Sequence, residues 1–246
     1  MVKEVDTIDK NEGSICQFDL YHGDCIEFMS GMAENSVDFT LTDIPYGVVN
    51  NYGSAGDEKA IRKLNKGAAD IVTFTLDEFL PLVHKVTGNS VCVFCGKEQF
   101  SQIFDYFASQ AGTTRAIVWD KTNPSPLGGQ YSYLSGIEMA VWFKKKGAKV
   151  FNAHCKNSVF RHPCGRSKLH PTEKNHALLK DLILDNTNEG DIVFDPCAGS
   201  GAHMLVALKN GRNTLGCEIK YEYYEIAKER LESVSSTQQI GMLEFA

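Results

Sequence analysis

The sequence lacks the signatures of several common functional classes. It contains neither a Gly-x-x-x-x-Gly-Lys-Ser/Thr loop nor a Gly-x-Gly-x-x-Gly fingerprint, the two glycine patterns that hold nucleotide phosphates. No run resembles a signal peptide or a membrane span, and the opening residues are polar and charged. Internal repeats and low-complexity tracts are also missing. These absences argue against a phosphate-recognised cofactor and against a membrane partner.

The 8 cysteines form no disulfide framework. Most lie in apolar, strand-like contexts, so we expect buried thiols in a reducing compartment. Cys92 and Cys95 have a metal-type spacing, but on a strand their side chains would point to opposite faces. The other candidate cluster is His154, Cys155, His162 and Cys164. Because that cluster lacks a second pair at a standard zinc spacing, we predict no metal site.

The sequence does contain a regular alternation of strand-like and helix-like segments. Strands are expected over residues 18–22, 37–42, 90–94, 115–119, 137–143, 191–194 and 214–217. Helices are expected over residues 25–32, 76–86, 98–109, 173–186, 204–208 and 221–231. Strands separated by helices predict an α/β fold with a doubly wound sheet and helices on both faces. The 246 residues, 43% of them hydrophobic, suit a single large domain.

One glycine-rich loop follows a buried strand. Residues 195–201 read Asp-Pro-Cys-Ala-Gly-Ser-Gly, after the apolar run 191–194 and before an apolar helix. This layout is typical of a nucleotide site in an open sheet. Gly199 and Gly201 would let the backbone approach a ligand without a Cβ clash. The next strand ends in Glu218, which suits a pair of ribose hydroxyls. A plain structural turn is the alternative interpretation.

A second motif, Asp-Ile-Pro-Tyr-Gly, follows another predicted strand at residues 43–47. Asp43 would lie at the carboxyl end of that strand, where α/β folds place ligands. Pro45 forces Ile44 into an extended conformation, which leaves the Ile44 carbonyl free to face a substrate. A carboxylate beside a carbonyl offers the two acceptors that an –NH2 group needs, and Tyr46 offers a flat face for a base. A strand-ending turn is again the alternative.

Together the motifs resemble those of the DNA amino-methyltransferases, which methylate adenine N6 or cytosine N4. The family patterns Asp-Pro-Pro-Tyr, Asp-Pro-Phe-x-Gly-Ser-Gly-Thr and His-Pro-Thr-x-Lys-Pro are matched at residues 43–46, 195–202 and 170–175. The catalytic motif comes first and the cofactor motif last, which is the permuted order of the β group. The resemblance covers roughly residues 16–232. It implies a Rossmann-like methyltransferase sheet over residues 1–246 and S-adenosylmethionine as the cofactor.

Three positions depart from the family pattern. Ile44 and Asn175 replace prolines, and Ala202 replaces a threonine. The family uses a backbone carbonyl at the first position, so the resemblance implies that the chemistry survives. None of these changes removes a group that must react. We expect weaker local rigidity and an active enzyme.

The resemblance also assigns site residues. The implied catalytic residues are Asp43, Ile44, Pro45 and Tyr46. The implied cofactor-binding residues are Asp24, Cys25, Asp43, His170, Thr172, Lys174, Asp195, Pro196, Ala198, Gly199, Ser200, Gly201 and Glu218. In the family the position of Asp24 contacts the cofactor adenine. A carboxylate that caps the following helix is the alternative.

Two stretches interrupt the α/β pattern. Residues 47–70 are rich in glycine and asparagine, and we expect a mobile flap over the target pocket. Residues 144–168 carry a charge of +8 within a chain of net −6, and lie where the family keeps its target-recognition region. The predicted DNA-binding residues are Lys144, Lys145, Lys156, Arg161, Arg166 and Lys168, with the two arginines as candidate readers of base edges. A solvated surface is the alternative for this segment.

The resulting hypothesis is an adenine-N6 methyltransferase acting on a flipped-out base of double-stranded DNA. Asp43 favours adenine, because the similar cytosine enzymes more often carry serine there. Cytosine N4 is the first alternative; an RNA or protein methyltransferase and a silent DNA-binding subunit are others. We expect no nuclease-like second domain and a bacterial or phage-infected cytoplasm. A homodimer and a separate restriction endonuclease partner stay open.

Overall fold

The computed structural model describes residues 16–46, 73–126, 129–165 and 173–243, with side chains to residue 234 in the last range. The predicted flap at residues 47–70 lies outside the described residues, as do Arg166, Lys168, His170 and Thr172. The described strands are β1 (Phe18–His22), β2 (Val37–Asp43), β3 (Thr87–Cys95), β4 (Gly112–Lys121), β5 (Ile137–Lys145), β6 (Val159–His162), β7 (Ile192–Asp195) and β8 (Asn213–Glu218). The described helices are α1 (Cys25–Gly31), α2 (Leu76–Val86), α3 (Phe100–Ala108), α4 (His176–Asn186), α5 (Ala202–Lys209) and α6 (Tyr221–Leu243).

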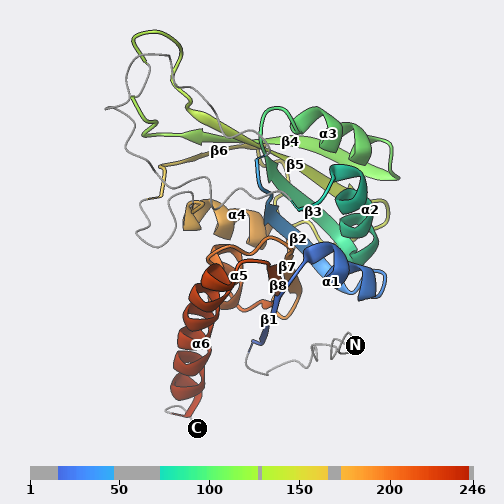
Figure 1. Cartoon of the computed structure of the whole chain (residues 1–246), viewed down its shortest axis with the longest axis vertical. Helices are drawn as coiled ribbons and strands as arrows, with labels where there is room; N and C mark the ends of the chain where they lie inside the picture. The colour runs from blue at the N-terminus through green and yellow to red at the C-terminus, as the bar shows by residue number, and fades with distance from the viewer. Residues whose placement is uncertain (1–15, 47–72, 127–128, 166–172, 244–246) are drawn as a thin grey trace.

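These strands form one 8-stranded sheet in the order β1-β8-β7-β2-β3-β5-β4-β6 (Figure 1). Neighbouring strands run parallel, except that β5 is antiparallel to both β3 and β4. Seven strands therefore end at one edge of the sheet, which we call the carboxyl edge, and β5 begins there. The register aligns Asp43 with Phe94 and Phe94 with Ala140, so residues 137–139 of β5 lie at this edge.

The chain reverses its direction of travel across the sheet between β7 and β2. From β2 it proceeds through α2 to β3, and from β7 it proceeds through α5 to β8 on the other side. The two central strands pair directly, with Thr40 opposite Phe194. A crevice forms at such a switch point, outside the carboxyl ends of the strands, and it is where open α/β sheets bind ligands. The two predicted motifs follow these two strands.

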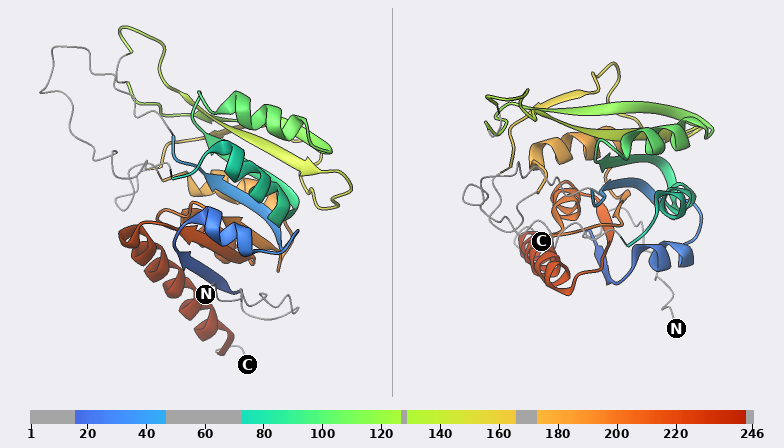
Figure 2. Two further views of the ribbon diagram at one scale, coloured as in Figure 1. Left: turned by 45° about the vertical axis from the view of Figure 1, so that its right-hand side comes forward. Right: turned by 45° about the horizontal axis from the view of Figure 1, so that its top comes forward.

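Helices cover both faces of the sheet, as predicted, with α1, α2 and α3 on one face and α4 and α5 on the other (Figures 1 and 2). The alternation along β3 shows why. Val91 and Val93 pack in the first core, whereas Cys92 and Phe94 pack in the second. Cys95 belongs to the first core, which confirms that Cys92 and Cys95 point to opposite faces.

Two features of the sheet were not predicted. β6 was not predicted, because only Phe160 of its four residues is buried and the segment has no apolar run. The antiparallel direction of β5 was not predicted either, since hydrophobic periodicity reports burial and carries no information on strand direction. No helix in the described part of the chain is long and apolar enough to cross a membrane.

Candidate active site

A cavity of about 740 Å³ opens at the carboxyl edge, above the switch point. Its walls come from both predicted motifs. They include Asp43, Ile44, Pro45 and Tyr46 after β2, and Pro196, Cys197, Ala198, Gly199 and Ser200 after β7. The rest of the wall includes Gly23 after β1, Glu138 at the start of β5, Lys174 before α4 and Glu218 at the end of β8. A volume of this size is typical of a site for a small organic ligand.

The loop after β7 is held by two carboxylates with different placements. Asp195 is fully buried, and its Oδ1 accepts a hydrogen bond from the Cys197 amide at 3.1 Å. Its Oδ2 lies 2.5 Å from Nδ1 of His203 on α5. The side chain thus joins the loop to the helix beneath it. Asp195 shapes the predicted cofactor site from below, whereas Pro196 and the residues after it form the wall.

Glu218, at the end of β8, holds the same loop from the other side. Its Oε2 accepts from the Gly199 amide at 2.7 Å, and its Oε1 accepts from the Lys220 amide at 2.8 Å. Burial raises the pKa of this carboxyl above its ordinary value, although the two amide donors act in the opposite direction. Glu218 also lines the cavity, so a carboxylate faces the ligand space at the strand tip.

The two glycines of the loop are needed for reasons that the sequence did not indicate. Gly199 has φ +52°, and a Cβ there would meet nothing within 4 Å. Its requirement is therefore the left-handed backbone. Gly201 has φ +76°, and its Cβ would lie 2.9 Å from the Cβ of Ala227 on α6. Gly201 therefore allows a close approach between the loop and a helix.

Asp24 caps a helix in this structure. Its Oδ1 accepts from the amides of Ile26 and Glu27, at 2.8 and 3.3 Å, as the N-cap of α1. This is the alternative role considered for the residue. Its chain neighbours Gly23 and Cys25 line the cavity. Cofactor contact at Asp24 and Cys25 stays a prediction, since the helix cap leaves it untested.

The catalytic motif is fixed by the neighbouring strand β3 and the turn after it. The Ile44 amide donates to the Phe94 carbonyl at 3.2 Å, and Gln99 Nε2 donates to the Pro45 carbonyl at 3.0 Å. The Ile44 side chain is 1% exposed and packs in the core. Asn175 is one of the three departures from the family pattern. Its side chain caps α4 by accepting hydrogen bonds from two backbone amides, whereas we expected reduced rigidity at this position.

Asp43 is the centre of a compact polar group. The Tyr46 hydroxyl donates to Asp43 Oδ1 at 3.0 Å, and Lys174 Nζ donates to Asp43 Oδ2 at 2.5 Å. Lys174 Nζ also lies 3.2 Å from the Tyr46 hydroxyl and 2.9 Å from Oε2 of Glu138. Lys121 pairs with Glu138 Oε1 at 2.6 Å. Two cations and two carboxylates therefore alternate along one chain of contacts.

The side chain of Lys174 is only 4% exposed, so its charge depends on these partners. Burial alone would lower the pKa of the Lys174 ammonium, but the charges of Asp43 and Glu138 and the hydrogen bond to Asp43 outweigh it and hold that pKa well above its ordinary value. Burial, with the Asp43 charge, raises the pKa of Tyr46 well above its ordinary value. Tyr46 is therefore a hydrogen-bond donor at neutral pH, and Lys174 is a cation.

An arginine of α6 joins the third motif to the cofactor loop. Arg230 Nη2 donates to Glu173 Oε1 at 3.0 Å, and Arg230 Nη1 donates to the Ser200 carbonyl at 2.7 Å. Lys174, the next residue after Glu173, reaches Asp43. One short segment thus spans the two halves of the cavity. We had predicted cofactor binding for Lys174, whereas the structure places its ammonium against the catalytic motif.

Sequence reasoning missed Glu138, Lys121, His203 and Arg230. Glu138 is the most informative omission, because it lies at the start of a strand that was predicted correctly. In a parallel sheet the start of a strand lies at the edge opposite the ligands. Only the reversal of β5 brings Glu138 to the carboxyl edge. In the sequence, Glu138 appears only as a single acidic residue beside an apolar segment.

The sequence and the fold of this chain are similar to those of known proteins. A family model described as DNA methylase matches residues 37–229, well over half of the chain. The chain belongs to this DNA methylase family. The match confirms the family and the fold class inferred from the motifs. It covers both adenine-N6 and cytosine-N4 enzymes and does not separate them.

Individual relatives agree with the family. Type II methyltransferase M2.MboI of Moraxella bovis is 26% identical over 245 residues, covering 89% of each chain. DNA adenine methyltransferase YhdJ of Escherichia coli strain K12 is 48% identical over 66 residues, which are 27% of this chain and 22% of that protein. The crystal structure of the M1.HpyAVI–SAM complex matches with a TM-score of 0.66 and 28% identity, over 87% of this chain and 100% of that one.

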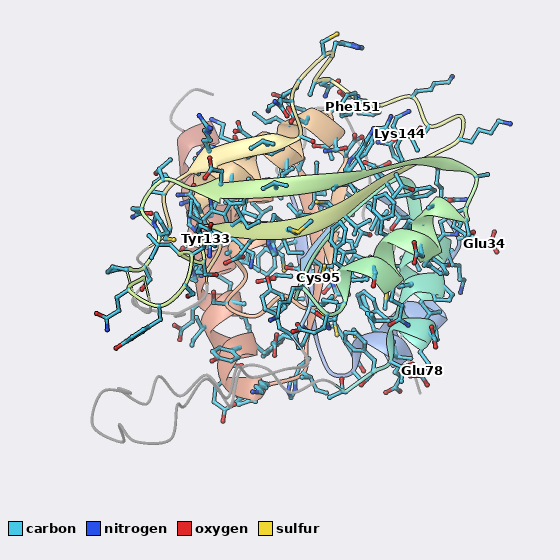
Figure 3. The ribbon with its side chains drawn as sticks, turned by 90° about the horizontal axis from the view of Figure 1, so that it is seen from above. Glu34, Glu78, Cys95, Tyr133, Lys144 and Phe151 are labelled. Atoms are coloured by element: carbon cyan, nitrogen blue, oxygen red, sulfur yellow. The ribbon has the colours of Figure 1, made fainter. Side chains whose placement is uncertain are left out.

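The predicted DNA-binding residues that the structure describes, Lys144, Lys145, Lys156 and Arg161, do not form one surface. Lys144 and Lys145 end β5, at the edge opposite the cavity, and Lys145 Nζ donates to Asn35 Oδ1 at 2.9 Å. Figure 3 shows Lys144 far from Tyr133, which lies beyond the other end of β5. The reversal of β5 is again the physical reason. These two lysines cannot contact DNA at the mouth of the cavity.

The other two predicted DNA-binding residues that the structure describes, Lys156 and Arg161, are both paired with acids. Lys156 Nζ lies 2.8 Å from Oδ2 of Asp185, near the end of α4. Arg161 Nε donates to Asp120 Oδ2 at 2.9 Å, yet its side chain is 76% exposed. Arg161 is aligned with Asp120 at the carboxyl edge, on the side of the cavity. Among the described residues of the segment it is the best placed for a bound duplex.

The histidines and cysteines of the basic segment are also separate. His162 Nε2 lies 3.0 Å from Asp181 Oδ2 on α4. In the described ranges, no group of three His, Cys, Asp or Glu side chains could hold a metal ion.

Proposed function

We propose that this DNA methylase transfers a methyl group from S-adenosylmethionine to N6 of an adenine in DNA. The observation that carries the proposal is the position of Asp43, whose carboxylate lines a cavity shared with a glycine loop at the switch point. A carboxylate at this position favours adenine over cytosine. The local similarity to a protein named as a DNA adenine methyltransferase supports the same choice. Cytosine N4 is the alternative.

The residues of the cavity fit the cofactor. Glu218 presents a buried carboxylate to the ligand space and suits a ribose hydroxyl pair, while residues 196–200 form the adjoining wall. Gly199 has no neighbour within 4 Å of its Cβ position, so the loop leaves room there. When bound, the cofactor supplies a methyl group that is already activated by its sulfonium. The protein therefore needs to bind and orient the target amine and to let its proton leave, and no covalent enzyme intermediate is required.

Asp43 and the Ile44 carbonyl are proposed to accept the two N–H bonds of the target amine. Both Asp43 oxygens already accept one donor, and each carboxylate oxygen has room for a second. Accepting both hydrogens directs the nitrogen lone pair toward the methyl carbon. The bound cofactor would supply the methyl carbon to that lone pair and would keep the electron pair of the broken C–S bond on its sulfur. One proton then leaves the nitrogen for Asp43 or for water.

Tyr46 is proposed to contact two groups, the target base and the Asp43 carboxylate. Its hydroxyl is bound at Asp43, which fixes the ring at the wall of the cavity. An aromatic face in this place suits stacking with a base. The target amine is inaccessible inside a duplex, so the base has to be flipped into the cavity. Arg161, exposed at the same edge, is the described residue proposed to contact the duplex.

The identity of the methylated base tests the proposal directly. Plasmid DNA and a matched RNA would be incubated with the enzyme and S-adenosylmethionine, digested, and analysed as nucleosides by mass spectrometry. We expect N6-methyladenine in the DNA alone. Asp43→Ala should reduce its formation on the order of 100-fold or more, with cofactor binding by calorimetry little changed. Exclusive N4-methylcytosine would overturn the choice of base, and modified RNA would overturn the choice of nucleic acid.

A further inference from the structure

In the structure, the Lys174 ammonium shares the Asp43 oxygen that the target amine needs. The ammonium lies 2.5 Å from Asp43 Oδ2, and the side chain is almost fully buried. While this contact persists, the ammonium neutralises the Asp43 carboxylate and weakens it as a hydrogen-bond acceptor. Separating the ammonium from Asp43 without a new partner would cost substantial free energy, because a buried cation requires a charged partner. Efficient methyl transfer therefore requires a second place for this cation within the site.

Glu138 provides that place. Its Oε2 is 2.9 Å from Lys174 Nζ in the same structure, so only a small rotation would transfer the ammonium from one carboxylate to the other. Its Oε1 is held by Lys121 at 2.6 Å, which fixes the carboxylate from the outer side. The Glu138 side chain is 24% exposed, whereas that of Lys174 is 4% exposed. The Asp43 side chain is 22% exposed, so the buried ammonium lies between two carboxylates of similar exposure.

We propose that Glu138 is a positioning residue, which takes over the Lys174 ammonium when the target amine binds to Asp43. This role rests on the proposed function of Asp43 as the amine acceptor. The cation then exchanges partners without leaving the site, and Asp43 becomes a full acceptor only when the base is in place. Lys121 keeps Glu138 in position for the exchange. The positive charge stays close to both carboxylates throughout.

The direct test is Glu138→Gln, which preserves shape and removes the charge. Lys174 then has Asp43 as its remaining carboxylate partner, so we expect kcat to fall on the order of 10-fold or more. The KM and the dissociation constant for S-adenosylmethionine should stay within about twofold, since Glu138 lies on the catalytic side. The matched control is Glu34→Gln, because Glu34 is exposed and precedes β2 at the opposite edge (Figure 3). It should be indistinguishable from wild type.

Two further variants separate positioning from simple packing. Glu138→Asp retains the charge but shortens the side chain, so it should recover most of the activity lost in Glu138→Gln. If Glu138 only filled space, the isosteric Gln variant would be the more active of the two. In a Lys174→Met background, Glu138→Gln should cost no further activity, since the cation to be moved is gone. Independent effects of the two substitutions would contradict the proposal.

The outcomes also separate this inference from the proposed function. A wild-type enzyme that methylates no DNA would overturn the function of the site, and the role of Glu138 with it. An active wild type, with Asp43→Ala inactive and Glu138→Gln fully active, would overturn the role of Glu138 alone. A large loss of cofactor affinity in Glu138→Gln would also contradict the inference. A thermal unfolding curve for each variant checks that the compared proteins are folded.

Discussion

The Asp195→Ala substitution should mainly reduce the stability of the fold, although the residue opens the cofactor motif. Asp195 is 0% exposed, and its two oxygens satisfy the Cys197 amide at 3.1 Å and His203 Nδ1 at 2.5 Å. Alanine leaves both donors buried without their acceptor. Each unsatisfied buried group costs about 1–3 kcal/mol, so we expect the free energy of unfolding to fall by roughly 3–5 kcal/mol.

Urea denaturation followed by circular dichroism measures this loss. The midpoint should fall while the m-value stays constant, because the surface exposed on unfolding hardly changes. Asp19→Ala is the matched control, since Asp19 is an exposed carboxylate on β1. At a temperature where the Asp195 variant is folded, its affinity for S-adenosylmethionine should fall less than that of a Glu218 variant. A midpoint within error of wild type, combined with a large loss of cofactor affinity, would refute the structural role assigned to Asp195.

Three other predictions follow from the site and its surroundings. Glu218→Ala should weaken S-adenosylmethionine binding, measured by calorimetry without DNA, by roughly 10- to 100-fold, because the lost charged acceptor holds the loop and faces the ligand. The raised pKa of Glu218 makes the folded state bind its proton more tightly than the unfolded state. The associated stability is fully present below the ordinary carboxyl pKa and is lost as pH rises through the folded value. The stability of Glu218→Gln relative to wild type should accordingly increase across that window in pH-dependent urea denaturation, and a constant difference would contradict it. Arg161→Gln should reduce the slope of log K for DNA against log salt by about 0.9, whereas Lys144→Gln should leave it unchanged. Equal effects of the two changes would contradict the geometry of β5.

The motif-bearing strands could be predicted because their chemistry is local. The strand before Asp43, the loop after β7 and the acid at the tip of β8 are all legible as short patterns, and their meeting follows from the parallel arrangement of β2, β7 and β8. The helix cap at Asp24 was one of two readings of a single carboxylate. The contacts of its oxygen show the cap, and the cofactor contact stays a prediction.

The remaining parts of the site depend on long-range pairing. Glu138 and Lys174 are far apart in the sequence, and neither forms a motif with the other. Their contact requires the direction of β5, which local hydrophobicity does not encode. Because the direction of β5 was unknown, Lys144 and Lys145 were also predicted to bind DNA. β6 was not predicted, because an edge strand with one buried residue has no hydrophobic periodicity.

The reversed strand β5 also determines where the chain can vary. Because β4 ends and β5 begins at the carboxyl edge, the connection between them is a hairpin that extends beyond the sheet (Figures 1 and 2). Ser135 and Ile137, at the end of this connection, line the cavity. Hairpin loops tolerate insertions and substitutions much better than strands do. Changes in its length or composition would reshape the entrance met by a nucleic acid while the alignment of Asp43 with Phe94 and Ala140 stays intact. The part of the cavity wall that tolerates change is thus separate from the strands that position Asp43.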